Sequence, residues 1–230
     1  RPAAHPAAST SPLLKPIIMS ESQYRYGFYA RPCLALSRTQ AEIHDLLRRQ
    51  YGLISAGLFM PHATVKGFFR SDAEPDAMIA SLDATLRDWR PFVAYNNGVI
   101  RMGHAGIVIS VKSMPDGSDN EAWHELQDRA WAALQPHYHP ECEFTPGDGR
   151  GRSGKGAFHP HFTLAMADVR PSLIDEVMAF VEQDGLVGPP QIRIEALHLF
   201  RFRANWSGAW WHTLTWELLH SWWSKLPSSA

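Results

Sequence analysis

The spacing of hydrophobic and polar residues predicts an alternation of strands and helices from residue 24 onward. Period-two stretches predict strands over residues 24–36, up to Phe69, twice within 92–114, after 158, and in a final hairpin of 191–202 and 209–219. Helical spacing predicts helices over residues 37–51, 71–89, 120–134 and 171–183. Ser37 is placed to cap the first helix and Gly52 to end it.

Both halves of the chain run in the order strand, helix, strand, helix. This order predicts an α+β fold of two lobes related by a pseudo-twofold duplication, with antiparallel-rich sheets facing a central cleft. We expect residues 21–230 to form one such two-lobed domain, since 230 residues can bury one sizeable core.

Residues 1–20 are rich in Pro, Ala and Ser and contain no continuous apolar region of the signal-peptide type. Met19 is a candidate natural start, which would make the preceding residues an upstream extension. We expect this segment to be a disordered tail outside the fold.

Composition and charge narrow the function. Net charge is −1, with 45% hydrophobic and 20% charged residues, as in ordinary soluble proteins. A chain without a basic surplus is poorly suited to long nucleic acids, so a small or short phosphate ester is the better ligand. Cys33 and Cys142 do not form a disulfide framework, and no run of about 18 apolar residues occurs. We therefore expect a cytoplasmic protein without a membrane partner.

One short pattern occurs twice, as Pro61-His62-Ala63-Thr64-Val65 and as Pro160-His161-Phe162-Thr163-Leu164. In a strand, His and Thr two residues apart project to the same face, while the apolar residues between them enter the core. Two such strands side by side would bring two imidazoles and two hydroxyls into one cleft. The alternative is two buried strands with hydrogen-bonded core histidines.

Paired imidazoles suit the cleavage of a phosphodiester. Such a reaction needs a base for the attacking oxygen, an acid for the leaving oxygen and donors for the non-bridging oxygens. Imidazole has an unperturbed pKa of about 6.5 and can take either of the first two roles. Thr64 and Thr163 can supply the donors.

The doubled motif resembles that of the 2H phosphoesterase superfamily, which includes 2′,5′-RNA ligase-like proteins and cyclic nucleotide phosphodiesterases. The resemblance implies His62 and His161 as acid and base, with either assignment open, and Thr64 and Thr163 on the phosphate. It implies metal-independent cleavage of a 2′,3′-cyclic phosphate or 2′,5′-phosphodiester in a nucleotide or short RNA, with no cofactor. We expect a monomer. The alternatives are a module that binds a nucleotide or RNA end without turnover, and a metal-dependent hydrolase.

Four further residues are candidates for substrate binding. Lys66, two residues after Thr64, could share the same face of the strand, or it could extend to solvent from the strand end. Arg152 and Lys155 belong to a loop that could form a cationic cover or remain a solvated loop. His159 could line the cleft beside His161.

Three other patterns in the sequence could indicate a function. The glycine-rich stretch 149–156 approaches a P-loop but has Gly156 where Ser or Thr should hold Mg²⁺, so we reject it. The spacing of the histidines in 137–161 and Cys142 fits no compact zinc motif, and no metal site is expected. Six of nine tryptophans follow residue 205; base stacking is one use, and filling the core is the favoured one.

Overall fold

The computed structural model describes residues 24–140 and 158–224, and it has the α+β architecture predicted from the sequence. Nine strands and four α-helices make up this part of the chain, together with short 3₁₀ turns. The strands are β1 (Tyr24–Arg31), β2 (Ala63–Phe69), β3 (Phe92–Tyr95), β4 (Val99–Met102), β5 (Gly106–Ser110), β6 (His161–Ala165), β7 (Gln191–Ile194), β8 (Ala196–Arg203) and β9 (Thr215–Trp223). The helices are α1 (Leu34–Tyr51), α2 (Pro75–Leu86), α3 (Glu121–Leu134) and α4 (Ile174–Val181), and the 3₁₀ turns include η2 (Ala56–Leu58) and η3 (Gln135–His137).

Seven strands form one antiparallel sheet in the order β4-β5-β6-β2-β1-β8-β9, and β3 and β7 form a separate pair. The large sheet consists of two groups, because β2 and β6 are joined through a single residue pair, Ala63 with Phe162. The strands β1, β2, β8 and β9 make up one group, and β4, β5 and β6 the other. The two motif strands thus meet at the boundary between the groups.

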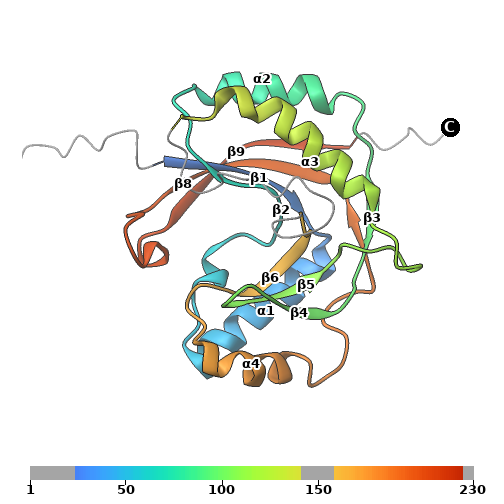
Figure 1. The fold of residues 1–230 in the computed structure, drawn as a ribbon, viewed down its shortest axis with the longest axis vertical. Coiled ribbons are helices and arrows are strands. Elements are labelled where there is room, and N and C mark those ends of the chain that lie inside the picture. Colours follow the sequence, from blue (N-terminus) through green and yellow to red (C-terminus); the bar gives the residue numbers. More distant parts are fainter. Residues whose placement is uncertain (1–23, 141–157, 225–230) are drawn as a thin grey trace, which may run out of the picture.

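The helices lie at opposite ends of the molecule, with α2 and α3 above the first group of strands and α1 and α4 beside the second (Figure 1). Each motif strand is contacted by the helix that precedes the other motif strand: α1 packs on β6, and α3 packs on β2. The order β1-α1-β2-α2 is repeated as β5-α3-β6-α4, as the sequence predicted. That the repeat reflects a duplication stays a prediction.

Several element boundaries differ from those predicted. Helix α1 begins at Leu34, directly after its N-cap Cys33, so Ser37 lies in the first turn and does not cap the helix. Strand β1 ends at Arg31 because Pro32 cannot donate to a sheet ladder. Gly52 does end the helix, at a φ of 72°. Helix α2 is shorter than predicted, since Pro75 occupies its first turn.

Two predicted strand regions are divided more finely in the structure. Residues 92–110 contain three strands instead of two, and the segment 191–203 is broken at Glu195 into β7 and β8. Strands β3 and β7 pair with each other outside the large sheet, which explains why β3 is separate from β4 and β7 from β8. No helix in the described part of the chain is long and apolar enough to cross a membrane.

Candidate active site

Both motif strands place their alternate residues as predicted. Ala63, Val65, Phe162 and Leu164 are at most 1% exposed and belong to the hydrophobic core. A strand presents successive side chains to opposite faces, so the His and Thr of each motif project away from that core. The four motif side chains therefore line the other face of the sheet.

The pairing of Ala63 with Phe162 fixes how the two motifs face each other. The two strands run antiparallel through this pair, so His62 and Thr163 lie on one side of it and Thr64 and His161 on the other. The four motif side chains are therefore grouped around the single residue pair that joins β2 and β6.

The two imidazole rings are held by the same hydrogen bond. Nδ1 of His62 donates to the carbonyl oxygen of Met60, and Nδ1 of His161 donates to that of His159, both at 2.7 Å. A carbonyl oxygen can only accept, so Nδ1 carries the proton in both neutral rings. The lone pair of each ring is therefore at Nε2, which can accept a proton from a bound group.

Both rings favour the neutral form. The pKa of His62 is lowered to about 4, mainly by burial and also by the charges of His161 and His44, while the hydrogen bond to Met60 acts in the opposite direction. Burial also lowers the pKa of His161; the hydrogen bond to the His159 carbonyl opposes this shift, and the charge of His159 adds to it. The charge of His161 is one of the causes that lower the pKa of His62, which agrees with the two rings lying near each other.

Helix α1 enters the gap where β2 and β6 separate. The carbonyl oxygen of Thr163 accepts hydrogen bonds from Nε2 of Gln40 at 2.8 Å and Nε2 of His44 at 3.0 Å. Gln40 is 1% exposed. A buried carbonyl without a strand partner needs donors from elsewhere, and these two side chains supply them. Sequence reasoning missed both residues, because a polar residue on a helix gives no sign of its tertiary partner.

A second connection links the segments that flank the motifs. The carboxylate of Asp168, after the second motif, accepts hydrogen bonds from the backbone N–H groups of Ile54 and Ser55 at 2.7 and 2.9 Å. The Ser55 hydroxyl lies 2.7 Å from the same carboxylate and 2.6 Å from the Met166 carbonyl oxygen. These contacts fix the approach to the first motif against the end of the second.

Tyr29 supports His62 from the neighbouring strand. The two ring centroids are 4.6 Å apart at 72°, an edge-to-face contact. Phe59 contacts the same imidazole at 5.7 Å. The Tyr29 ring also occupies the space where a Cβ on Gly27 would lie. The aromatic surroundings explain the strong burial of His62, and the motif itself did not predict them.

The prediction that Lys66 lines the site is wrong. Lys66 pairs with Phe28, whereas Thr64 pairs with Tyr29, and adjacent residues of β1 face opposite ways. A register shift between these pairs turns Lys66 to the face opposite Thr64. Its Nζ lies 4.9 Å from the ring centroid of Tyr138, and the residue is 4% exposed.

The remaining predicted residues have different outcomes. His159 lies beside His161, and its Nε2 is 2.9 Å from the Ser110 hydroxyl; its binding role stays a prediction. Arg152 and Lys155 lie outside the described residues, as does the stretch compared with a P-loop. Within the described residues, no three His, Cys, Asp or Glu side chains gather in a metal-binding arrangement. Cys142 lies outside that part of the chain.

The tryptophans divide between two uses. Trp206 and Trp210 pack against Phe68, with ring centroids 5.1 and 5.9 Å away, which is the core-filling role favoured from the sequence. Trp216 and Trp223 are 42% and 56% exposed and project from β9. Base stacking therefore stays open for this second group.

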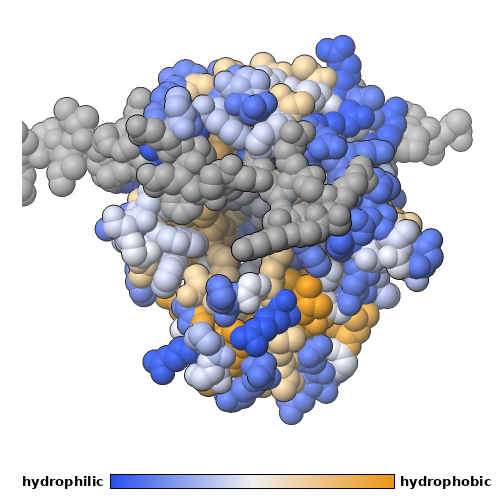
Figure 2. Space-filling view, in the orientation of Figure 1, coloured by the Kyte–Doolittle hydropathy of each residue, from blue (hydrophilic) through white to orange (hydrophobic). Residues whose placement is uncertain are grey.

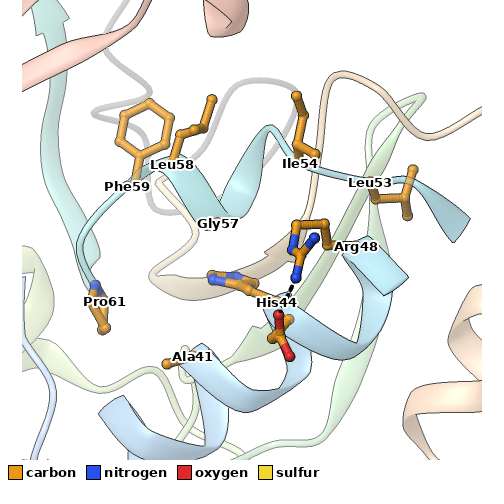
Figure 3. A pocket seen from close by; sticks show the side chains of 10 residues that line it. Ala41, His44, Arg48, Leu53, Ile54, Gly57, Leu58, Phe59 and Pro61 are labelled. Carbon is orange, nitrogen blue, oxygen red and sulfur yellow. Dashed lines mark hydrogen bonds and ion pairs between the residues drawn. The ribbon is translucent and has the colours of Figure 1, made fainter. Parts of the chain in front are cut away.

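Two hollows lie on either side of Pro61. The β9 hollow, of about 290 Å³, is lined by His62 and by residues of β1, β8 and β9. The α1 hollow, of about 350 Å³, lies between α1 and the segment 53–61. Figure 3 shows His44 and Arg48 reaching from α1 toward the α1 hollow. Arg48 forms an ion pair with Asp45 of the same helix. On the face drawn in Figure 2, hydrophobic side chains gather mainly in the lower half, around β4 and β5.

A comparison of the sequence with models of known protein families identifies one family. The family model of the 2′-5′ RNA ligase superfamily matches residues 36–206. The sequence matches no curated protein.

Solved structures resemble the chain at low identity. The structure of E. coli LigT complexed with 3′-AMP is 12% identical, with a TM-score of 0.48, and the match covers 88% of this chain and 98% of LigT. That of Kluyveromyces marxianus Usb1 with uridine monophosphate is 11% identical, with a TM-score of 0.40, and covers 87% and 100%. Because the family model spans most of the sequence, the chain belongs to the 2′-5′ RNA ligase superfamily, in agreement with the resemblance carried by its two motifs.

Proposed function

We propose that the chain is a phosphodiesterase that uses His62 and His161 as general acid and base, without a metal ion, on a 2′,3′-cyclic phosphate or a 2′,5′-phosphodiester. The observation that supports this most directly is that the two rings make the same kind of hydrogen bond. Each Nδ1 donates to a carbonyl two residues upstream, which leaves Nε2 of each ring as the proton acceptor.

The proposed reaction assigns each group one task. One neutral imidazole takes the proton of the attacking oxygen, water or a neighbouring hydroxyl, as the new P–O bond forms. The other imidazole, protonated, gives its proton to the leaving oxygen as the old P–O bond breaks. Thr64 and Thr163 donate to the non-bridging oxygens. The direction of the reaction decides which ring is the base.

Because both rings have a low pKa, we expect substrate binding to determine which ring is protonated. In the free protein both imidazoles are mainly neutral near pH 7, because burial lowers the pKa of each. A phosphodiester carries a negative charge, and an opposite charge nearby raises the pKa of an imidazole. Substrate binding would thus protonate the ring that acts as the acid.

A substrate panel tests the proposal. The purified protein is incubated with 2′,3′-cyclic nucleotides and with 2′,5′-linked oligonucleotides, in excess EDTA and without it. Turnover that persists in EDTA supports the proposal, while loss of turnover in EDTA favours a metal-dependent hydrolase. Binding without turnover of any member would favour the nucleotide-binding module.

A further inference from the structure

The β9 hollow adjoins the proposed catalytic centre directly, since His62 is one of its walls. His198 pairs with Tyr29 across β1 and β8, and Tyr29 contacts the His62 ring. Paired residues share a face of the sheet, so the hollow lies on the same face as the motif histidines. A group attached to a phosphate at His62 can therefore enter it.

The walls of this hollow are flat and apolar. Phe200 and Trp216 meet edge to face, with centroids 5.4 Å apart at 87°. The indole N–H of Trp216 donates to the Leu58 carbonyl oxygen at 2.9 Å, which fixes the ring between β9 and η2. A fixed, partly exposed aromatic ring is a stacking surface for a planar group, and such stacking is sequence-tolerant for nucleobases.

The polar groups of the hollow differ in charge. Nδ1 of His198 lies 2.8 Å from the Ser221 hydroxyl, and burial, with the charge of Arg31, lowers the pKa of His198 to about 4. His198 is therefore neutral near pH 7. Among the described residues that line the hollow, Arg31 is the only cation at that pH.

Arg31 is oriented but has no carboxylate partner within the described residues. Its guanidinium lies 4.1 Å from the ring centroid of Trp223, which holds the group in a cation–π contact. Strand β1 places Arg31 two residues from Tyr29, about 7 Å along the strand. A planar guanidinium with unused donors is well suited to bind a phosphate.

We propose that the β9 hollow binds the nucleoside attached to the scissile phosphate, and that Arg31 binds a second phosphate carried by that nucleoside. This inference rests on the function proposed above and specifies its substrate class. The preferred substrate is a nucleotide with a further phosphate, as at the end of a short RNA, and not a nucleoside whose only phosphate is the scissile one.

Two matched substrates test the inference: adenosine 2′,3′-cyclic phosphate and the same compound with a 5′-phosphate. For the wild-type protein we expect a lower KM for the 5′-phosphorylated compound. Arg31→Gln should remove most of that advantage, a change of roughly tenfold in the ratio of the two KM values. Arg38→Gln, which removes an exposed cation of α1, is the control and should keep the wild-type ratio. Trp216→Ala should raise KM for both compounds.

The outcomes separate this inference from the proposed function. If both compounds are cleaved and Arg31→Gln keeps the wild-type ratio, the inference is overturned while the phosphodiesterase remains. If neither is cleaved, calorimetry compares adenosine 3′-monophosphate with adenosine 3′,5′-bisphosphate. Tighter binding of the bisphosphate that depends on Arg31 then supports the subsite although the catalytic proposal fails. Equal binding of the two compounds overturns the subsite as well.

Discussion

The two motif histidines have the same hydrogen bond but different surroundings. His62 lies among aromatic rings, with Tyr29 and Phe59 against it and the β9 hollow beside it. His161 lies beside polar groups, since its neighbour His159 is bonded to Ser110, and the carbonyl of Thr163 is held by helix α1. Two copies of one motif thus provide equivalent ring geometry in unequal environments.

This difference indicates how a symmetric motif can act on an asymmetric substrate. The hydrogen bonds to Met60 and His159 set the same nitrogen free on both rings. The aromatic side suits a nucleoside, and the polar side suits groups that carry hydroxyls or charge. The proposed acid–base chemistry depends on the ring orientation that both motifs have in common. The proposed specificity depends on the difference between the aromatic surroundings of His62 and the polar surroundings of His161.

The largest expected effect tests whether the two histidines are functionally equivalent. His62→Ala and His161→Ala should each lower kcat by about 10²–10⁴-fold, because general acid and base act in one transition state. Their far-ultraviolet circular dichroism should match that of the wild type. His104→Ala, in an exposed turn, serves as the control. Either motif variant keeping more than a tenth of wild-type activity contradicts the paired mechanism.

The next effect concerns the hydroxyls. Thr64→Val and Thr163→Val should each lower kcat by roughly 10²-fold, as the loss of one donor to a developing charge does. Threonine does not titrate near neutrality, so the limbs of the pH profile should stay in place. Thr215→Val, on the exposed strand β9, should change neither quantity. A displaced limb would mean that the substitution perturbs a histidine instead.

A smaller effect should distinguish the two motif strands. Gln40→Leu removes a donor to the Thr163 carbonyl and should lower kcat by about tenfold, because the second motif strand loses a partner in the gap. His44→Leu should also raise the pKa of His62, since the charge of His44 lowers it. Ring titration by NMR measures that shift. Gln50→Leu, at an exposed helix position, is the matched control. Equal kcat values for Gln40→Leu and the control would refute the positioning role.

The last effect is on stability and depends on pH. The pKa of His62 is about 4 in the folded protein and about 6.5 when unfolded, so the unfolded state binds the proton more readily. The stability from the neutral ring is complete above about pH 6.5 and is lost as the pH falls toward 4, by at most about 3 kcal/mol. Denaturant unfolding at pH 7 and 4.5 should show a smaller loss for His62→Gln than for wild type. An unchanged loss contradicts the low pKa of His62.

The motif geometry was predictable because it follows from local periodicity. Strand alternation alone sets Ala63 and Phe162 into the core and the histidines away from it, and Gly52 ends α1 because its backbone adopts a positive φ. Lys66 was not predictable in the same way. A bulge depends on the pairing with β1, and one extra residue reverses which face a side chain takes.

The position of helix α1 in the gap between β2 and β6 shows a second limit of prediction from the sequence. Helical periodicity places Ile43, Leu46 and Leu47 on one apolar face. In the structure Leu46 is 38% exposed, whereas the polar Gln40 is buried. Gln40 is buried because β2 and β6 separate and leave a carbonyl without a strand partner. That need arises only when the two halves of the chain come together, so no local pattern encodes it.

The contact between Tyr29 and Gly27 has a consequence for mutational tolerance. Any side chain at Gly27 would collide with the Tyr29 ring, and that ring is one of the supports of His62. A mutational scan selected for activity should therefore accept almost no substitution at residue 27, although this residue belongs to neither motif. Pairing the substitution with a smaller residue at position 29 should partly restore tolerance, so these two positions should vary together in laboratory evolution.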